Sequence, residues 1–185
     1  MKLANFTSRI RARLIAKSFN RELVTGSEIL DIGCGTGVVL KELANIFPFK
    51  KMMGCDIENY LITDIPFKIQ KDSSILPFKN NQFDIAMFND VLHHIPFEEQ
   101  KILINESVRV SKKVIIFELL PKPINKLGDY LLNKIHNPNM YIPFTYRTVS
   151  GWKNVFSKDG ISCKVVAVNK PLLYPFDHVG FILSR

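Results

Sequence analysis

The chain of 185 residues has the length of one ordinary domain, and its 46% hydrophobic and 23% charged residues are typical of a globular protein. No apolar run approaches the roughly 20 residues of a bilayer helix, and arginines stand where a secretory signal has its apolar stretch. We therefore expect a single domain over residues 1–185, without a membrane span.

The formal net charge of +8 is concentrated near the start of the chain. Its first 25 residues hold six basic side chains and one acidic side chain, whereas the rest is nearly neutral. Apolar residues recur every four positions from Phe6 to Leu14, and Arg9, Arg13 and Lys17 form a basic stripe beside them. A basic N-terminal helix is therefore predicted within residues 1–25, where a polyanion such as nucleic acid could dock.

Three cysteines, Cys34, Cys55 and Cys163, are an odd number and include no Cys-x-x-Cys pair. Such a set assembles neither a disulfide framework nor a standard zinc site. We therefore expect a cytoplasmic protein with no metal site.

A strand, a tight turn and a helix are predicted in succession after Gly26. The run Glu28–Ile32 suits a buried strand, glycines follow at positions 33, 35 and 37, and a helical pattern then ends at Pro48. Lys51–Asp56 is predicted as the second strand and Phe67–Asp72 as the third. The short connection between them has room for at most a short helix around Asn59–Ile62.

The fourth strand is predicted at Phe83–Phe88, followed by helical material from Asn89 to about Ser111 that is interrupted near Pro96. Val114–Phe117 is a continuous apolar run typical of a central strand. Strands that alternate with helices predict an α/β domain with a mostly parallel sheet.

The end of the chain departs from this alternation. Ile161–Asn169 and His178–Ser184 both resemble strands, and the connection between them is too short for a crossover helix, so they are expected to pair antiparallel. Residues 121–147 are rich in aromatic and apolar side chains and belong to neither half of the sheet. We interpret this insertion as a mobile lid over a ligand site, broken into short pieces by prolines.

The glycine-rich turn does not have the spacing of a nicotinamide-binding fingerprint. That pattern, Gly-x-Gly-x-x-Gly, requires a third glycine where this chain has Val38, counted from Gly33, or Leu40, counted from Gly35. Alternate glycines after a strand instead leave room for a ligand to approach the backbone at the carboxyl end of the sheet.

The stretch Asp31-Ile32-Gly33-Cys34-Gly35-Thr36-Gly37 resembles the Asp/Glu-x-Gly-x-Gly-x-Gly turn of class I S-adenosylmethionine-dependent methyltransferases. Further segments match that family in order, and Val91-Leu92-His93-His94 resembles its type 11 small-molecule subgroup. The resemblance covers about residues 26–120. It implies a doubly wound, mostly parallel seven-stranded Rossmann-like sheet, with S-adenosylmethionine as cofactor and S-adenosylhomocysteine as product.

The same resemblance implies roles for individual residues. Asp56 matches the acid that binds the cofactor ribose, and Asp72 with Ser73 matches the segment that contacts adenine. The turn glycines give room to the methionine end, and Asp31 helps to place its ammonium group. The full set implied to bind the cofactor is Asp31, Gly33, Cys34, Gly35, Gly37, Asp56, Ile57, Asp72, Ser73 and Asn89.

No catalytic residue is required by this chemistry, because the sulfonium is already activated and the enzyme mainly aligns and desolvates. His93, His94 and Tyr146 are the main candidates for a base, and His136 is a further one within residues 121–147. For each histidine, a structural place at the start of a helix is the competing interpretation. Asp90 is interpreted as a helix N-cap rather than as a base.

Three hypotheses about the function follow, of which two name an acceptor. The first is a small molecule bound under the lid. The second is RNA or a protein docked through the basic N-terminal helix. Phe88-Asn89-Asp90-Val91 lacks the Asn/Asp-Pro-Pro-Tyr/Phe segment of enzymes that methylate exocyclic amines of nucleic acids, which favours the first. The third is a protein that binds the cofactor without catalysis.

Overall fold

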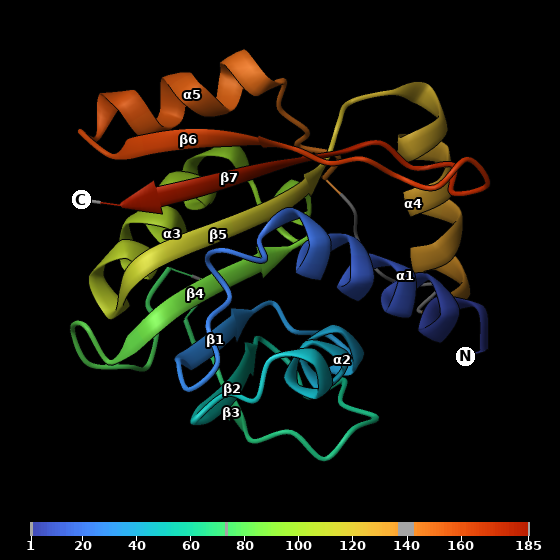
Figure 1. Cartoon of the computed structure of the whole chain (residues 1–185). Helices are drawn as coiled ribbons and strands as arrows, with labels where there is room; N and C mark the ends of the chain where they lie inside the picture. The colour runs from blue at the N-terminus through green and yellow to red at the C-terminus, as the bar shows by residue number, and fades with distance from the viewer. Residues whose placement is uncertain (1, 73, 137–142, 185) are drawn as a thin grey trace.

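A computed structural model describes residues 2–72, 74–136 and 143–184, and it contains a sheet of seven strands in the order β3-β2-β1-β4-β5-β7-β6 (Figure 1). All neighbouring strands are parallel except β7, which pairs antiparallel with both β5 and β6. The strands are β1 (Glu28–Ile32), β2 (Lys51–Asp56), β3 (Phe67–Ile69), β4 (Phe83–Asn89), β5 (Ser111–Leu119), β6 (Ser162–Ala167) and β7 (His178–Ser184). The predicted fold class and the antiparallel C-terminal pair are confirmed.

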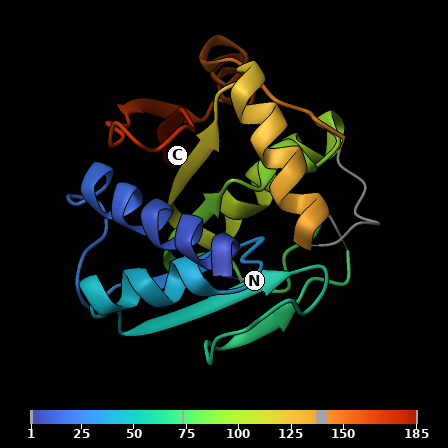
Figure 2. The same ribbon diagram turned by 90° about the vertical axis from the view of Figure 1, so that its right-hand side faces the viewer.

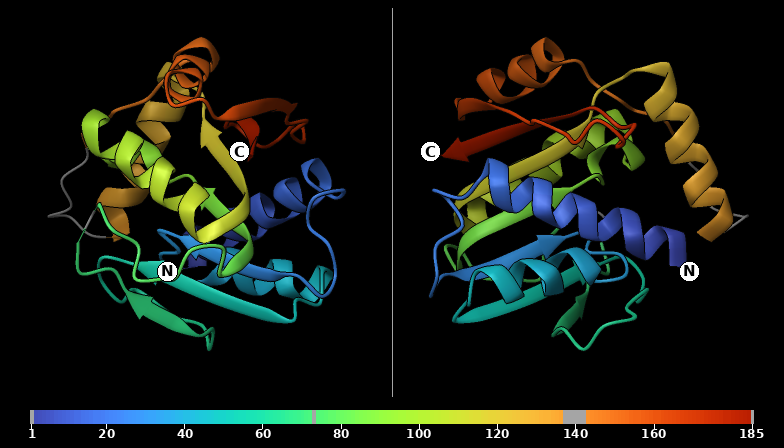
Figure 3. Two further views of the ribbon diagram at one scale, coloured as in Figure 1. Left: turned by 90° about the vertical axis from the view of Figure 1, so that its left-hand side faces the viewer. Right: turned by 45° about the vertical axis from the view of Figure 1, so that its right-hand side comes forward.

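Helices cover both faces of this sheet, as Figure 3 shows from two sides. One buried cluster joins α1 and α2 to one face, and the second joins α3 and α5 to the other face. Central strands such as Val114–Phe117 contribute side chains to both clusters in alternation, so both of their faces are buried. The helices are α1 (Lys2–Ser18), α2 (Val38–Ile46), the 3-10 helix η1 (Leu92–His94), α3 (Phe97–Val110), α4 (Pro123–His136) and α5 (Val149–Lys158).

The chain order reverses between β1 and β4, which lie side by side in the middle of the sheet. In open α/β sheets the carboxyl ends of the strands at this reversal form the ligand crevice. Figure 2 looks onto that edge, where α1 and α4 stand in front of the strands. The topology therefore places the glycine turn, which follows β1, at the ligand edge.

One predicted boundary needs correction. Strand β3 ends at Ile69 instead of Asp72, because its partner β2 ends at Asp56 and offers no further backbone. No helix forms around Asn59–Ile62, where the backbone is held by bonds from the Leu61 N–H to Asn59 Oδ1 and from the Ile62 N–H to the Thr36 carbonyl. Helix α5 was not anticipated.

The segment 121–147 also differs from its expected form. Its described part is dominated by one continuous helix, α4 (Pro123–His136), rather than several short pieces. Pro123 is the first residue of α4, a position that its fixed φ suits. Among the described residues, no helix is long and apolar enough to cross a membrane.

Candidate functional site

The glycine turn is built by close packing at the ends of β1 and β4. Gly33 has a φ of +68°, and a Cβ there would lie 2.3 Å from Cγ2 of Val91. The N–H groups of Gly33 and Cys34 both donate to the carbonyl of Cys55, which ties the turn to the end of β2. Only glycine satisfies both the left-handed backbone and this contact.

A cavity of about 630 Å³ opens beside this turn, within the range of small-molecule sites. A Cβ added at Gly35 would meet nothing within 4 Å, so the backbone there is open to a ligand. The walls come from the turn, the ends of β2 and β4, η1 and helices α1 and α4. The lining residues implied by the family resemblance are Gly33, Cys34, Gly35, Asp56, Ile57 and Asn89.

Asp56 is the last residue of β2, and its carboxylate joins the turn to that strand. Its Oδ2 accepts a hydrogen bond of 2.9 Å from the Gly35 N–H, and its Oδ1 accepts one of 2.8 Å from the Ile57 N–H. Burial raises the pKa of Asp56, and these two backbone donors oppose the rise. Each oxygen keeps a second lone pair that can accept a hydrogen bond from a ligand hydroxyl.

Asp31 lies in β1 beneath the turn and is fully buried. Neither of its carboxylate oxygens has a hydrogen-bond partner within the described chain. Burial raises the pKa of Asp31 to about 8, and the nearby Asp56 carboxylate adds to the rise. The Oδ1 atom of Asn89 is likewise buried and unpartnered at the end of β4. Unpartnered polar atoms beside an open backbone suit a ligand that supplies hydrogen-bond donors, such as the S-adenosylmethionine that the resemblance implies.

Other residues implied to bind the cofactor, Asp31 among them, are not part of the cavity wall. A Cβ at Gly37 would lie 2.4 Å from Thr63 Oγ1, so this glycine admits the connection between β2 and β3. Asp72 is exposed, and its Oδ1 accepts a hydrogen bond from the Ser74 N–H, while Gln70 lines the cavity instead. Ser73 lies outside the described residues. Contact between Asp72 and adenine stays a prediction.

The three candidate catalytic residues come together around a side chain that the sequence analysis missed, Asp129 of α4. His93 and His94 place their Nε2 atoms 3.4 and 3.5 Å from Asp129 Oδ1. The hydroxyl of Tyr146 donates to Asp129 Oδ2 at 2.7 Å, and its ring stacks on that of His93. Of these four residues, His94 and Asp129 line the cavity.

The electrostatics of this group assign different roles to its members. Burial opposes protonation of His93, but the Glu118 and Asp129 carboxylates raise its pKa to about 10. Burial, reinforced by Asp129, raises the pKa of Tyr146 above its usual value, so this phenol is a donor rather than a base. The geometry thus joins both histidines to Asp129, and a catalytic role for either of them stays a prediction.

Asp90 does not cap a helix, which corrects its interpretation. It has a φ of +51°, and the N-cap position of η1 belongs to Val91, which makes no capping bond. Its Oδ2 instead lies 3.0 Å from Nε2 of His178 and 3.2 Å from Nη1 of Arg11. Both partners line the cavity, so Asp90 holds α1 and β7 together at its rim. Because Arg11 and His178 are distant in sequence, no local signal connects them to Asp90.

The basic stripe of α1 is present, with exposed side chains at Arg9, Arg13 and Lys17. Arg9 pairs with Glu42 of α2 at 3.1 Å, which offsets part of its charge. On its other side α1 contributes Thr7, Ser8 and Arg11 to the cavity wall. Helix α1 therefore forms part of the cavity wall, independently of what its basic face binds.

Residues 30–116 match a family model described as "Methyltransferase domain". A tRNA (carboxymethyluridine(34)-5-O)-methyltransferase of Arabidopsis thaliana is 38% identical over 100 residues, which make up 51% of this chain and 24% of that protein. A malonyl-[acyl-carrier protein] O-methyltransferase of Legionella pneumophila is 31% identical over 74 residues, 35% of this chain and 26% of that protein. The matched region thus spans about a quarter of the length of these curated relatives.

Solved structures show the same architecture. The magnesium protoporphyrin IX methyltransferase of Synechocystis, crystallised with S-adenosylhomocysteine, is similar with a TM-score of 0.63 and 19% identity. That similarity covers 98% of this chain and 84% of the Synechocystis chain. At this identity the likeness shows a shared fold, which agrees with the class I methyltransferase topology.

Proposed function

We propose that this chain, whose residues 30–116 match the methyltransferase-domain family model, transfers a methyl group from S-adenosylmethionine to a small-molecule acceptor. The observation that carries the proposal is the open glycine turn facing a cavity with Asp56 at its edge. We assign the methionine end of the cofactor to Gly33 and Gly35, and its ribose to Asp56.

The chain's own contribution to the reaction is alignment and exclusion of water. When bound, S-adenosylmethionine supplies an electrophilic methyl group on a positively charged sulfur. Asn89 ends β4 and Asp90 follows it, and both line the cavity. They can orient polar groups of the cofactor or of the acceptor. We propose that His94 contacts the acceptor, because it alone among the candidate bases lines the cavity.

A small acceptor is favoured by the shape of the site. Helix α4 supplies Asp129, Leu132 and Asn133 to the cavity, opposite the turn. Elsewhere on its surface, α4 carries exposed apolar side chains, including Leu127 and Leu131. We propose that α4 forms the cover over the acceptor, within the residues 121–147 that the lid interpretation names.

The ribose assignment predicts the effect of Asp56→Ala. We expect this change to weaken binding of S-adenosylhomocysteine by about 1.5–3 kcal/mol, because hydrogen bonds to a charged group are lost. Isothermal titration calorimetry measures the affinity directly. Asp64→Ala serves as a control, since Asp64 pairs with Lys41 on the surface outside the cavity. Unchanged affinity in Asp56→Ala would mean that the ribose is held elsewhere.

The alternative acceptor, RNA docked on α1, makes a separate prediction. We expect at most weak binding of transfer RNA, whose affinity falls with salt by a slope of roughly 0.7–0.9 per phosphate contacted. Changing Arg9, Arg13 and Lys17 together to glutamine is expected to flatten that slope in fluorescence anisotropy. Tight binding that keeps its slope in the triple variant would place the polyanion on another surface and favour the RNA acceptor.

A further inference from the structure

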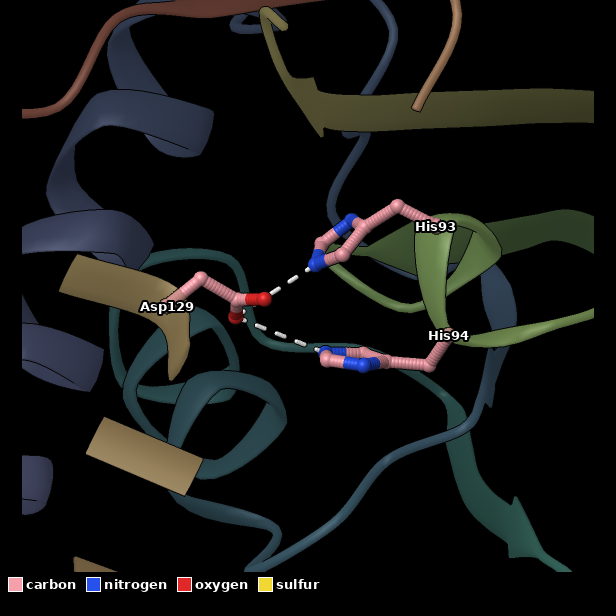
Figure 4. A group of neighbouring side chains, drawn as sticks. All are labelled: His93, His94 and Asp129. Atoms are coloured by element: carbon pink, nitrogen blue, oxygen red, sulfur yellow. Dashed lines mark ion pairs between the residues drawn. The ribbon is translucent and has the colours of Figure 1, made fainter. Parts of the chain in front are cut away.

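Three metal-ligating side chains converge at the acceptor side of the cavity. Nε2 of His93, Nε2 of His94 and an Asp129 carboxylate oxygen all lie within 4.8 Å of one another (Figure 4). The histidine nitrogens are 3.4 and 3.5 Å from Asp129 Oδ1. Ligands about 2.0–2.1 Å from a tetrahedral zinc ion are separated by roughly 3.3 Å, and both histidine–aspartate distances are close to that value.

Neighbouring side chains hold these metal-ligating atoms in position. Nδ1 of His93 lies 2.6 Å from Glu118 Oε2, which leaves Nε2 as the free nitrogen of the ring. That Nε2 is buried and has no hydrogen-bond partner in the described structure. A carboxylate behind a histidine is the usual outer arrangement of a metal-bound imidazole. Asp129 is fixed by Tyr146, which donates to Oδ2, and by Asn133, which donates to Oδ1 at 2.7 Å and leaves that oxygen a second lone pair.

The local charge also suits a dication. Glu118 and Asp129 are both buried, and each lies against His93. Two carboxylates in a low-dielectric place are balanced by one doubly charged ion once it displaces the proton of His93, which then binds as a neutral imidazole. Because His94 and Asp129 line the cavity, an ion held there would keep coordination positions open on the cavity side.

We propose that His93, His94 and Asp129 bind a first-row divalent cation, with Nε2, Nε2 and Oδ1 as ligands. Two histidines and one carboxylate with open positions form a set used for zinc and for non-haem iron. The open positions would take an oxygen or nitrogen of the acceptor, a role that rests on the proposed function. Metal binding itself does not, because it needs neither cofactor nor acceptor. The sequence analysis expected no metal, since it considered only the cysteines and Asp129 stands 35 positions from His94.

The test uses untagged, chelator-treated full-length protein without cofactor or acceptor. Equilibrium dialysis against zinc chloride, with metal analysis, is expected to give one zinc per chain. His94→Ala and Asp129→Asn are expected to weaken zinc binding by more than about 100-fold, because even losing an outer-sphere partner costs 10–100-fold. Glu118→Gln is expected to weaken zinc binding by about 10–100-fold. His178→Ala is the matched control, since His178 also lies against an aspartate but forms no three-membered cluster of metal-ligating groups among the described residues, and it should leave zinc affinity unchanged.

X-ray absorption of the zinc-loaded protein distinguishes the ligands. The expected spectrum contains imidazole scattering with nitrogen at about 2.0–2.1 Å and no sulfur near 2.3 Å. Three results would each overturn the proposal. The first is the absence of stoichiometric zinc. The second is zinc retained by both ligand variants when circular dichroism shows them folded, and the third is a shell of sulfur scattering. In the first case the cluster is an ion network around protonated His93. Since the Asp56→Ala calorimetry tests cofactor binding, the two proposals fail independently.

Discussion

Binding of S-adenosylhomocysteine is expected to strengthen about tenfold for each pH unit between roughly pH 6 and 8, and to level off above that range. The cause is Asp31, which is fully buried with both carboxylate oxygens unpartnered. Burial raises its pKa to about 8 in the free protein, so the carboxyl is protonated at lower pH. We propose that the ligand's ammonium group lies near Asp31, as the family resemblance implies, and that it there favours the ionised carboxylate.

The direction of the effect follows from the proton released. Below its free pKa the Asp31 carboxyl holds a proton that the complex does not hold, so rising pH favours the complex until the free protein is ionised as well. Calorimetric affinities across this pH range measure the slope. Asp31→Asn cannot titrate and is expected to give a nearly flat profile. If the affinity of the natural chain does not change with pH, or if Asp31→Asn shows the same slope, then Asp31 does not interact with the ammonium group.

Much of this site could be predicted because its determinants are local. The turn glycines follow β1 directly, and Asp56 ends β2, so strand patterns alone bring both to the carboxyl edge of the sheet. Helix α5 was missed although a local signal existed. Thr148 caps it by accepting from the Gly151 N–H, and Trp152 and Phe156 lie four residues apart on its buried face.

The acceptor side could not be predicted in the same way, because its contacts join distant elements. Glu118 stands within the otherwise apolar β5, where a buried acid requires a partner, but the sequence does not show that this partner is His93. Asp129 is one polar residue in the first half of an amphipathic helix. Only the docking of α4 against η1 turns it toward the histidines, as Figure 4 shows.

Asp90→Ala is expected to cost about 3–5 kcal/mol of the free energy of unfolding, the cost of breaking a buried charged cluster by removing one member. The Asp90 carboxylate has 6% exposure and lies against His178, whose side chain is fully buried, and Arg11, whose side chain is 25% exposed. Removing the carboxylate takes the counter-charge from Arg11 and the hydrogen-bond partner from His178. It also places alanine at a φ of +51°, which aspartate and asparagine tolerate better.

Two further variants separate these causes in urea denaturation. Asp90→Asn keeps a residue suited to the left-handed backbone and removes only the charge, so its loss of stability should be smaller than that of Asp90→Ala. Asp64→Ala breaks the exposed pair with Lys41 and is expected to change stability far less. Because Arg11 joins α1 to Asp90 at the cavity rim, hydrogen exchange in α1 should rise in both Asp90 variants before the sheet is affected. A loss in Asp90→Ala no greater than that in Asp64→Ala would mean that α1 is held by its apolar face alone.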